Sequence, residues 1–146
     1  MRQPDYRREG ITLYCGDNVA VMSEMPAESI DLVVTSPPYD NLRTYGGHTW
    51  DFEGVAAQLK RLLKPGGVIV WVVNDATVDG SETGTSFRQA LHFKEIGLRL
   101  HDTMIWNRIG SFPESNRYHP AFEYMFVLSK GQPTTTNIIK DRSNSH

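Results

Sequence analysis

The fold follows most directly from residues 29–39, which read SIDLVVTSPPY. Residues 30–34 are apolar except for Asp31, a pattern that is typical of a strand buried within a sheet. The run leads directly into Pro37 and Pro38, and because proline has no backbone N–H to donate, the strand must end there. The carboxyl ends of parallel strands are where α/β folds bind their ligands. We therefore expect this segment to be a sheet strand that opens into a ligand-binding loop.

Strand and helix signals alternate along the rest of the chain. Apolar runs predict strands at residues 11–15, 68–73, 98–108 and 121–129, and periodicity and caps predict helices at 18–25, 52–64 and 85–97. Alternation of this kind predicts an α/β domain with a mainly parallel sheet. The last two strands have no helix between them, which predicts an antiparallel hairpin at one edge. We expect a flexible N-terminus at 1–10, a domain at 11–130 and a polar tail at 131–146.

Composition limits the classes of function. The chain has 146 residues, enough for one domain, and a net charge of -2, so it lacks the overall basic balance of a protein that coats nucleic acid. Contact with DNA would need local positive charge. No stretch is long enough to span a membrane, and no membrane contact is predicted. The single cysteine, Cys15, cannot form an internal disulfide, which favours a cytoplasmic location. The histidines lack metal-ligand spacing, so no metal site is expected.

The residues after the predicted strand suit a planar ligand that bears an amino group. Ser36 offers a hydroxyl, the carbonyls of Ser36 and Pro37 offer acceptors, and Tyr39 offers an aromatic face. A nucleobase with an exocyclic NH2 group matches these features, because the acceptors hold the amino hydrogens while the ring stacks. A tight Pro-Pro turn with a surface tyrosine is the plainer interpretation of the Pro-Pro-Tyr triplet alone. The apolar strand that precedes the triplet favours a binding site.

Five segments, taken in order, resemble the DNA amino-methyltransferases, which make N4-methylcytosine or N6-methyladenine. They read LYCGD (13–17), IDLVVTSPPY (30–39), LLKPGG (62–67), MIWNR (104–108) and FEYMFVLSK (122–130). The resemblance covers nearly the whole chain. It implies a partial Rossmann-like methyltransferase sheet, S-adenosyl-L-methionine as the cofactor and DNA as the partner, as in restriction-modification enzymes.

The resemblance also implies roles for individual residues. It assigns catalysis to Ser36, Pro37, Pro38 and Tyr39, cofactor binding to Asp17, Thr35 and Ser36, and DNA contacts to Asn41, Arg43 and Tyr45. Asp17 is equally well explained as the N-cap of the following helix. The polar loop that holds the three DNA-contact candidates could instead be mobile.

The implied mechanism is a direct methyl transfer to the amino nitrogen of a base flipped out of the duplex. Hydrogen bonds from the NH2 group to Ser36 and to the Pro37 carbonyl would make that nitrogen more nucleophilic, and positioning would supply most of the rate. Methylation at C5 of cytosine is disfavoured, because it needs a nucleophilic cysteine after a proline and Cys15 follows Tyr14.

The glycine-rich turn that completes the cofactor pocket in this family has no counterpart here. The close glycine pairs are Gly46-Gly47 and Gly66-Gly67, and neither follows a strand as the turn requires. In the permuted arrangement that the chain resembles, this turn lies near the C-terminus, and its strands separate residues 11–15 from the catalytic strand. We therefore expect a truncated or split enzyme. Either residues 11–15 dock beside the catalytic strand, or a second polypeptide or another copy fills the gap.

Several functions remain open from the sequence. The family has either serine or aspartate at the first position of this motif. The serine at position 36 slightly favours N4 of cytosine over N6 of adenine as the target. A methyltransferase that acts on RNA or on a protein amide keeps the chemistry and changes the substrate. An inactive methyltransferase fragment that serves as a binding or assembly module is the alternative from another class.

Overall fold

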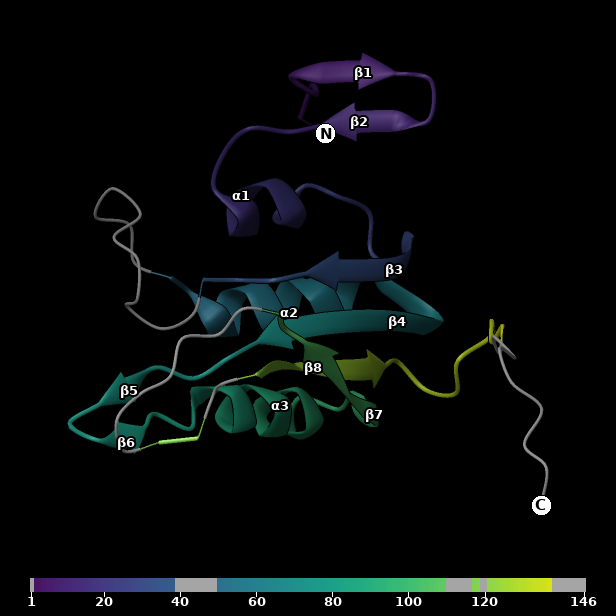
Figure 1. The fold of residues 1–146 in the computed structure, drawn as a ribbon. Helices are drawn as coiled ribbons and strands as arrows, with labels where there is room; N and C mark the ends of the chain where they lie inside the picture. Colours follow the sequence, from purple (N-terminus) through teal and green to yellow (C-terminus); the bar gives the residue numbers. More distant parts are fainter. Residues whose placement is uncertain (1, 39–49, 110–116, 119–120, 138–146) are drawn as a thin grey trace.

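The computed structural model describes residues 2–38, 50–109, 117–118 and 121–137 (Figure 1). The helices are α1 (Asn18–Ser23), α2 (Phe52–Leu62) and α3 (Thr85–Glu95). The strands are β1 (Tyr6–Arg8), β2 (Ile11–Leu13), β3 (Ile30–Thr35), β4 (Leu63–Val73), β5 (Thr77–Val78), β6 (Ser81–Glu82), β7 (Arg99–Asn107) and β8 (Phe122–Ser129).

The main sheet has four strands in the order β3-β4-β8-β7. Strands β3 and β4 are parallel, whereas β8 runs antiparallel to both β4 and β7. The α/β class and the antiparallel hairpin at one edge are confirmed. Parallel pairing among the described strands is confined to β3 and β4, because β8 turns back from β7 and inserts beside β4. The sheet is therefore mixed, with β3 at one edge and β7 at the other.

The helices pack against one face of this sheet. Side chains of α2 and α3, such as Leu59 and Phe93, share a buried cluster with Trp71 of β4 and Phe126 of β8. Aromatic rings meet edge to face there, and the Trp71 and Phe93 ring centroids are 5.1 Å apart. The buried Trp71 Nε1 donates to Gln89 Oε1 at 2.9 Å, which satisfies the one polar atom of the ring. This core holds β4 in place, and β3 pairs alongside β4.

Strand β4 starts earlier than the sequence predicted. The helix was expected to run to residue 64 and the strand to begin at 68, but α2 ends at Leu62 and β4 begins at Leu63. The pairing with β3 shifts register between Leu63 and Val68, so the Lys-Pro-Gly-Gly segment bulges out of the ladder. Gly66 has a φ of 78°, its N–H donates to the Lys130 carbonyl, and its carbonyl accepts from the Thr134 N–H.

An N-terminal hairpin lies apart from the main sheet. Residues 1–10 were expected to be flexible, but Tyr6–Arg8 forms β1 and pairs antiparallel with β2 through a turn at Gly10. Strand β2 covers only the first part of the predicted strand at 11–15. Because β2 pairs with β1, it does not dock beside β3, and the first of the two predicted arrangements is not the one observed.

Candidate active site

The predicted site lies where several chain segments end together. Figure 1 shows the carboxyl ends of β3 and β4 on the same side of the molecule as the first turns of α1, α2 and α3. Helix N-termini carry a partial positive charge and unpaired N–H groups, and strand ends of this kind commonly bind ligands. The end of β3 therefore lies at the carboxyl edge of the sheet, as the sequence predicts, and the loop after Pro38 lies outside the described residues.

Thr35, Ser36, Pro37 and Pro38 form the end of β3. Thr35 is half-buried and is the last residue in register with β4, opposite Trp71. Ser36 is exposed, Pro37 is buried and Pro38 is half-buried. The end of β3 thus places the exposed Ser36 directly beside a buried proline. Tyr39, Asn41, Arg43 and Tyr45, which the sequence also assigned to the site, lie outside the described residues.

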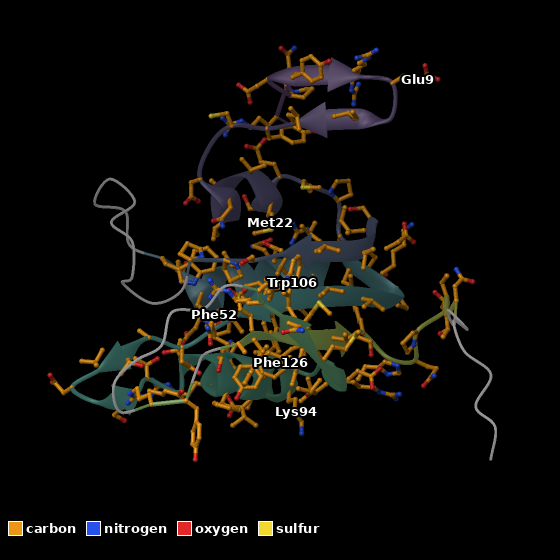
Figure 2. All side chains as sticks on the ribbon, in the orientation of Figure 1. Glu9, Met22, Phe52, Lys94, Trp106 and Phe126 are labelled. Carbon is orange, nitrogen blue, oxygen red and sulfur yellow. The ribbon has the colours of Figure 1, made fainter. Side chains whose placement is uncertain are left out.

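Asp17 is the N-cap of α1, as predicted. Its Oδ1 accepts a hydrogen bond from the Ala20 N–H at 2.8 Å, and the residue is exposed. The helix is held in place by Met22, which packs against the core below it (Figure 2). The Arg61 guanidinium reinforces this contact by donating to the carbonyls of Met22 and Met25 at 2.6 and 2.9 Å. The cofactor contact assigned to Asp17 stays a prediction.

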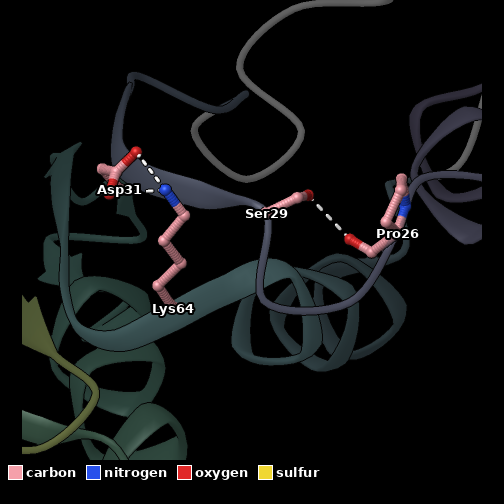
Figure 3. Close-up of polar contacts among 4 residues, drawn as sticks. All are labelled: Pro26, Ser29, Asp31 and Lys64. Atoms are coloured by element: carbon pink, nitrogen blue, oxygen red, sulfur yellow. Dashed lines mark hydrogen bonds and ion pairs between the residues drawn. The ribbon is translucent and has the colours of Figure 1, made fainter.

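The far end of β3 is fixed by two polar contacts (Figure 3). The Ser29 hydroxyl donates to the Pro26 carbonyl at 2.7 Å, and Lys64 Nζ forms an ion pair with Asp31 at 2.7 Å. The ion pair is exposed and contributes little stability. It links the first residues of β3 to the first residues of β4.

Sequence reasoning missed the role of Asp75, which follows β4. Its carboxylate accepts hydrogen bonds from the Thr83 hydroxyl at 3.1 Å and from the Ser86 N–H at 2.9 Å, and it also bonds to the Ser86 hydroxyl. The predicted caps of α3 were Thr85 or Ser86, but the N-cap position is Gly84 and the carboxylate comes from outside the helix. Nearby, burial raises the pKa of Tyr124, and the negative charges of Glu82 and Asp75 raise that pKa further.

A cleft of about 450 Å³ opens between the first turn of α2 and α3. Sequence reasoning missed it because its walls come from segments far apart in the chain. The Phe52 ring lines the cleft and meets the His92 ring edge to face at a centroid distance of 5.1 Å. The cleft is lined by Trp50, Phe52, Glu53, Thr85, Arg88, Gln89, Leu91, His92 and Glu95.

Metal and membrane features can be assessed for the described residues only. Within them, no group of three or more His, Cys, Asp and Glu side chains could hold a metal ion. In the same part of the chain, no helix is long and apolar enough to cross a membrane.

Comparison with known proteins decides the family. Residues 30–145 match the family described as DNA methylase, N6_N4_Mtase. The chain belongs to this DNA methylase family. The matched region begins with β3 and contains the Ser36-Pro37-Pro38 turn, so the resemblance inferred from the motifs is confirmed.

Individual relatives agree with this assignment. The orphan methyltransferase M.BamHII of Bacillus amyloliquefaciens is 60% identical to this methylase chain over 117 residues, which are 80% of the chain and 44% of M.BamHII. The type II methyltransferase M.BglII of Bacillus subtilis is 31% identical over 81% of the chain and 35% of its own length. The chain spans about half the length of the curated relatives it matches, or less.

Solved structures confirm the Rossmann-like methyltransferase fold. The Thermus thermophilus protein TTHA0409, solved in complex with S-adenosyl-L-methionine, superimposes with a TM-score of 0.63 at 27% identity, over 86% of this methylase chain and 57% of its own. The PvuII DNA methyltransferase superimposes with a TM-score of 0.66 at 24% identity, over 84% of this chain and 50% of its own.

Proposed function

We propose that this methylase chain is the catalytic part of an S-adenosyl-L-methionine-dependent DNA methyltransferase that modifies the exocyclic amino group of a flipped base. The observation that carries the proposal is the Ser36-Pro37-Pro38 turn, which leaves the exposed Ser36 at the carboxyl end of β3 in a member of the DNA methylase family. The 60% identity to M.BamHII, named as a methyltransferase, supports the same activity.

In the proposed mechanism, this turn binds and orients the amino group of the flipped base. The Ser36 hydroxyl and the Pro37 carbonyl accept hydrogen bonds from the NH2 group, and Tyr39 stacks on the ring. Withdrawing the nitrogen lone pair from conjugation makes the nitrogen a better nucleophile. Holding it in line with the methyl donor supplies most of the rate, and no covalent bond to the protein is needed.

The proposed target is N4 of cytosine rather than N6 of adenine. This preference rests on Ser36, because the family has either serine or aspartate at this position of the motif.

Asp17, Thr35 and Ser36 are the described residues that we propose to contact the cofactor. The cofactor supplies an electrophilic methyl group on a sulfonium. A carboxylate and two hydroxyls are suitable partners for its hydroxyl and amino groups. Asp17 and Ser36 are exposed; Asp17 caps the first turn of α1 and Ser36 follows β3, and Figure 1 shows these two element ends on the same side of the molecule. We propose that these three residues supply only part of the cofactor site, so the fit to the cofactor is partial.

We propose that a second polypeptide, or another copy of the chain, supplies the remaining cofactor-binding segment. Support comes from the relatives, of which the chain spans about half. We also propose a cytoplasmic location, because the single cysteine, Cys15, is exposed and free.

Methyl transfer tests the proposal directly. The chain is combined with the separately produced part of M.BamHII that lies outside the match, and tritium transfer from labelled S-adenosyl-L-methionine to DNA is counted. We expect incorporation with the natural sequence and its loss in Ser36→Ala and in Tyr39→Ala. Incorporation that survives both substitutions contradicts the catalytic assignment. Absence of incorporation into DNA favours the binding-module alternative. Incorporation into RNA or protein would show that RNA or protein, and not DNA, is the substrate.

A further inference from the structure

The cleft between the first turn of α2 and α3 is separate from the turn at the end of β3. Its volume is about 450 Å³, which lies in the range of small-molecule pockets. Of the described residues that we propose for catalysis or cofactor binding, none lines it. The proposed function therefore leaves this cleft without a role.

Helix α3 turns a polar stripe toward the cleft. Residues three or four apart lie on the same face of a helix. Five residues at this spacing line the cleft: Thr85, Arg88, Gln89, His92 and Glu95. A helix face that packs against another helix is normally apolar, whereas a face in contact with water is polar. The stripe therefore belongs to water or to a polar ligand.

Trp50 brings a hydrogen-bond donor without an acceptor to the same cleft. In the part of the chain that the structure describes, its Nε1 is the only buried side-chain nitrogen or oxygen that lacks a hydrogen-bond partner. The buried Trp71 Nε1, by contrast, donates to Gln89 Oε1 at 2.9 Å. Leaving a buried donor unpaired costs stability, so the Trp50 N–H favours a ligand that supplies an acceptor.

The rest of the wall suits a flat ring. Phe52, labelled in Figure 2, begins α2, and its ring meets the His92 ring at a centroid distance of 5.1 Å. Gln89 is 5% exposed, and because its Oε1 is committed to Trp71, its NH2 group remains to donate. A planar group with acceptors along its edge would satisfy both the rings and the donors.

The charged residues of the cleft narrow the class of ligand further. Glu53, Glu95 and Arg88 are all exposed, so two carboxylates face one guanidinium. This balance disfavours a phosphate or another anion. Carboxylates accept hydrogen bonds, which suits a ligand that carries an amino group beside its acceptor.

We propose that the cleft is a second binding site, for a nucleobase that bears an exocyclic amino group. Adenine and cytosine each place a ring nitrogen acceptor directly beside an NH2 group. The ring nitrogen accepts from the Trp50 indole N–H, the amino group donates to a carboxylate of the cleft, and the ring packs against Phe52 and His92. The inference goes beyond the proposed function, because methyl transfer at Ser36 does not require this site.

The base belongs either to a free nucleoside or to a nucleotide of a DNA strand. Both present the same ring and amino group to the cleft. The excess of carboxylates favours the free nucleoside, which carries no phosphate.

Titration calorimetry of the natural chain with adenosine, cytidine and uridine tests the site. We expect saturable binding of adenosine or cytidine, and binding of uridine that is weaker by about tenfold, because uridine has a carbonyl in place of the amino group. A single-stranded oligonucleotide of adenine and cytosine is titrated in parallel to separate the two sources of the base.

Two tryptophan substitutions locate the binding. Trp50→Phe keeps an aromatic ring and removes the N–H, so it should weaken binding about tenfold. Trp106→Phe is the matched control, because Trp106 lies on β7 and does not line the cleft. Ser36→Ala should also leave the affinity unchanged, which separates this site from the catalytic turn.

A carboxylate variant provides a second test in case Trp50→Phe does not fold. Glu53 and Glu95 are exposed, so replacing both with alanine should preserve the fold and weaken binding of the amino-bearing nucleosides. The control replaces two exposed glutamates outside the cleft, Glu9 on the N-terminal hairpin (Figure 2) and Glu24 after α1. We expect this control to bind like the natural chain.

The possible outcomes separate clearly. Oligonucleotide binding that weakens in Trp50→Phe, without binding of free nucleosides, supports the site and identifies a DNA strand as the source. Absence of saturable binding in every titration would overturn the proposal. Equal affinity for uridine, or an affinity that neither the Trp50 nor the carboxylate variant changes, would overturn it as well.

Discussion

Neighbouring residues at the end of β3 have different environments, and this difference gives the turn its proposed chemistry. Pro37 is buried and fixes the backbone, while Ser36 beside it is exposed. Pro37 and Pro38 have no backbone N–H, so they bring carbonyl acceptors and no backbone donors to this segment. The site therefore offers acceptors rather than donors, as recognition of an amino group requires.

Substituting Ser36 by alanine tests its role in catalysis. Loss of one hydrogen bond to the reacting amino group should lower the single-turnover methylation rate about 10- to 100-fold. The matched control is Ser29→Ala at the other end of β3, where the hydroxyl bonds to the Pro26 carbonyl at 2.7 Å. We expect Ser29→Ala to leave the methylation rate within about twofold. Equal rates for the two variants would exclude Ser36 from the reaction.

Two substitutions of Asp17 separate its role as the cap of α1 from its proposed contact with the cofactor. Asp17→Ala should cost about 1 kcal/mol of folding stability because it removes the cap of α1, and Asp17→Asn should retain most of that stability. If the carboxylate also contacts the cofactor, both variants should weaken S-adenosyl-L-methionine binding in the completed complex. Thermal denaturation measures the first effect and titration calorimetry the second. Unchanged cofactor affinity in both variants would leave Asp17 as a cap only.

Residue-level prediction from sequence succeeded where the signal is local. Asp17 was recognisable as a cap because an aspartate directly precedes a helical pattern. Asp75 was not recognisable, because it bonds to Thr83 and Ser86, 8 and 11 residues away, across the β5–β6 hairpin. Such a contact leaves no periodic or spacing pattern in the sequence.

At the level of elements, the long strands and helices were predicted to within a few residues, apart from β4, which begins at Leu63 and not at residue 68, and the short hairpins were missed. The apolar runs that became β3, β7 and β8 are long enough to show a pattern. The β5–β6 hairpin has strands of two residues, and its signal is only the turn at Asp79-Gly80, where both residues have positive φ. Strand β1 is entirely exposed, so it carries no apolar run to reveal it.

The bulge at the start of β4 can be tested at Gly66. Gly66 and Gly80 have nearly equal φ values, 78° and 77°, so alanine is strained at both. A Cβ at Gly80 would meet nothing within 4 Å, whereas one at Gly66 would collide with Thr134 and lie 3.0 Å from the Gln132 carbonyl oxygen. Gly80→Ala should cost about 1 kcal/mol and Gly66→Ala about 1–3 kcal/mol more.

Urea denaturation of the two variants measures this difference. A larger loss for Gly66→Ala would show that residues 132–134 are docked against the bulge in solution. Equal losses would mean that the tail is not held there.

At the level of the whole molecule, the sheet resembles half of a layered α/β domain. The sequence predicted a missing neighbour from the absent glycine-rich turn, and the structure places β3 at the edge of its sheet with an apolar face beside it. The arrangement of that edge could not be predicted from sequence, because an apolar run does not reveal which of its faces is covered. No motif in the sequence predicts the pairing of β2 with β1 either.

The chain alone should bind S-adenosyl-L-methionine weakly or not at all, because Asp17, Thr35 and Ser36, the described residues that we propose as cofactor contacts, supply only part of a cofactor site. Isothermal titration measures this directly, with the combined complex as the positive control. Micromolar affinity in the isolated chain would contradict this account of an incomplete site.

The identity of the methylated base tests the central claim most directly. DNA incubated with S-adenosyl-L-methionine, the chain and the complementing part of M.BamHII is digested to nucleosides and analysed by mass spectrometry. The account predicts N4-methylcytosine that is absent when Ser36→Ala replaces the natural chain. DNA that contains only C5-methylcytosine, or that carries no methylated amino group, would contradict it.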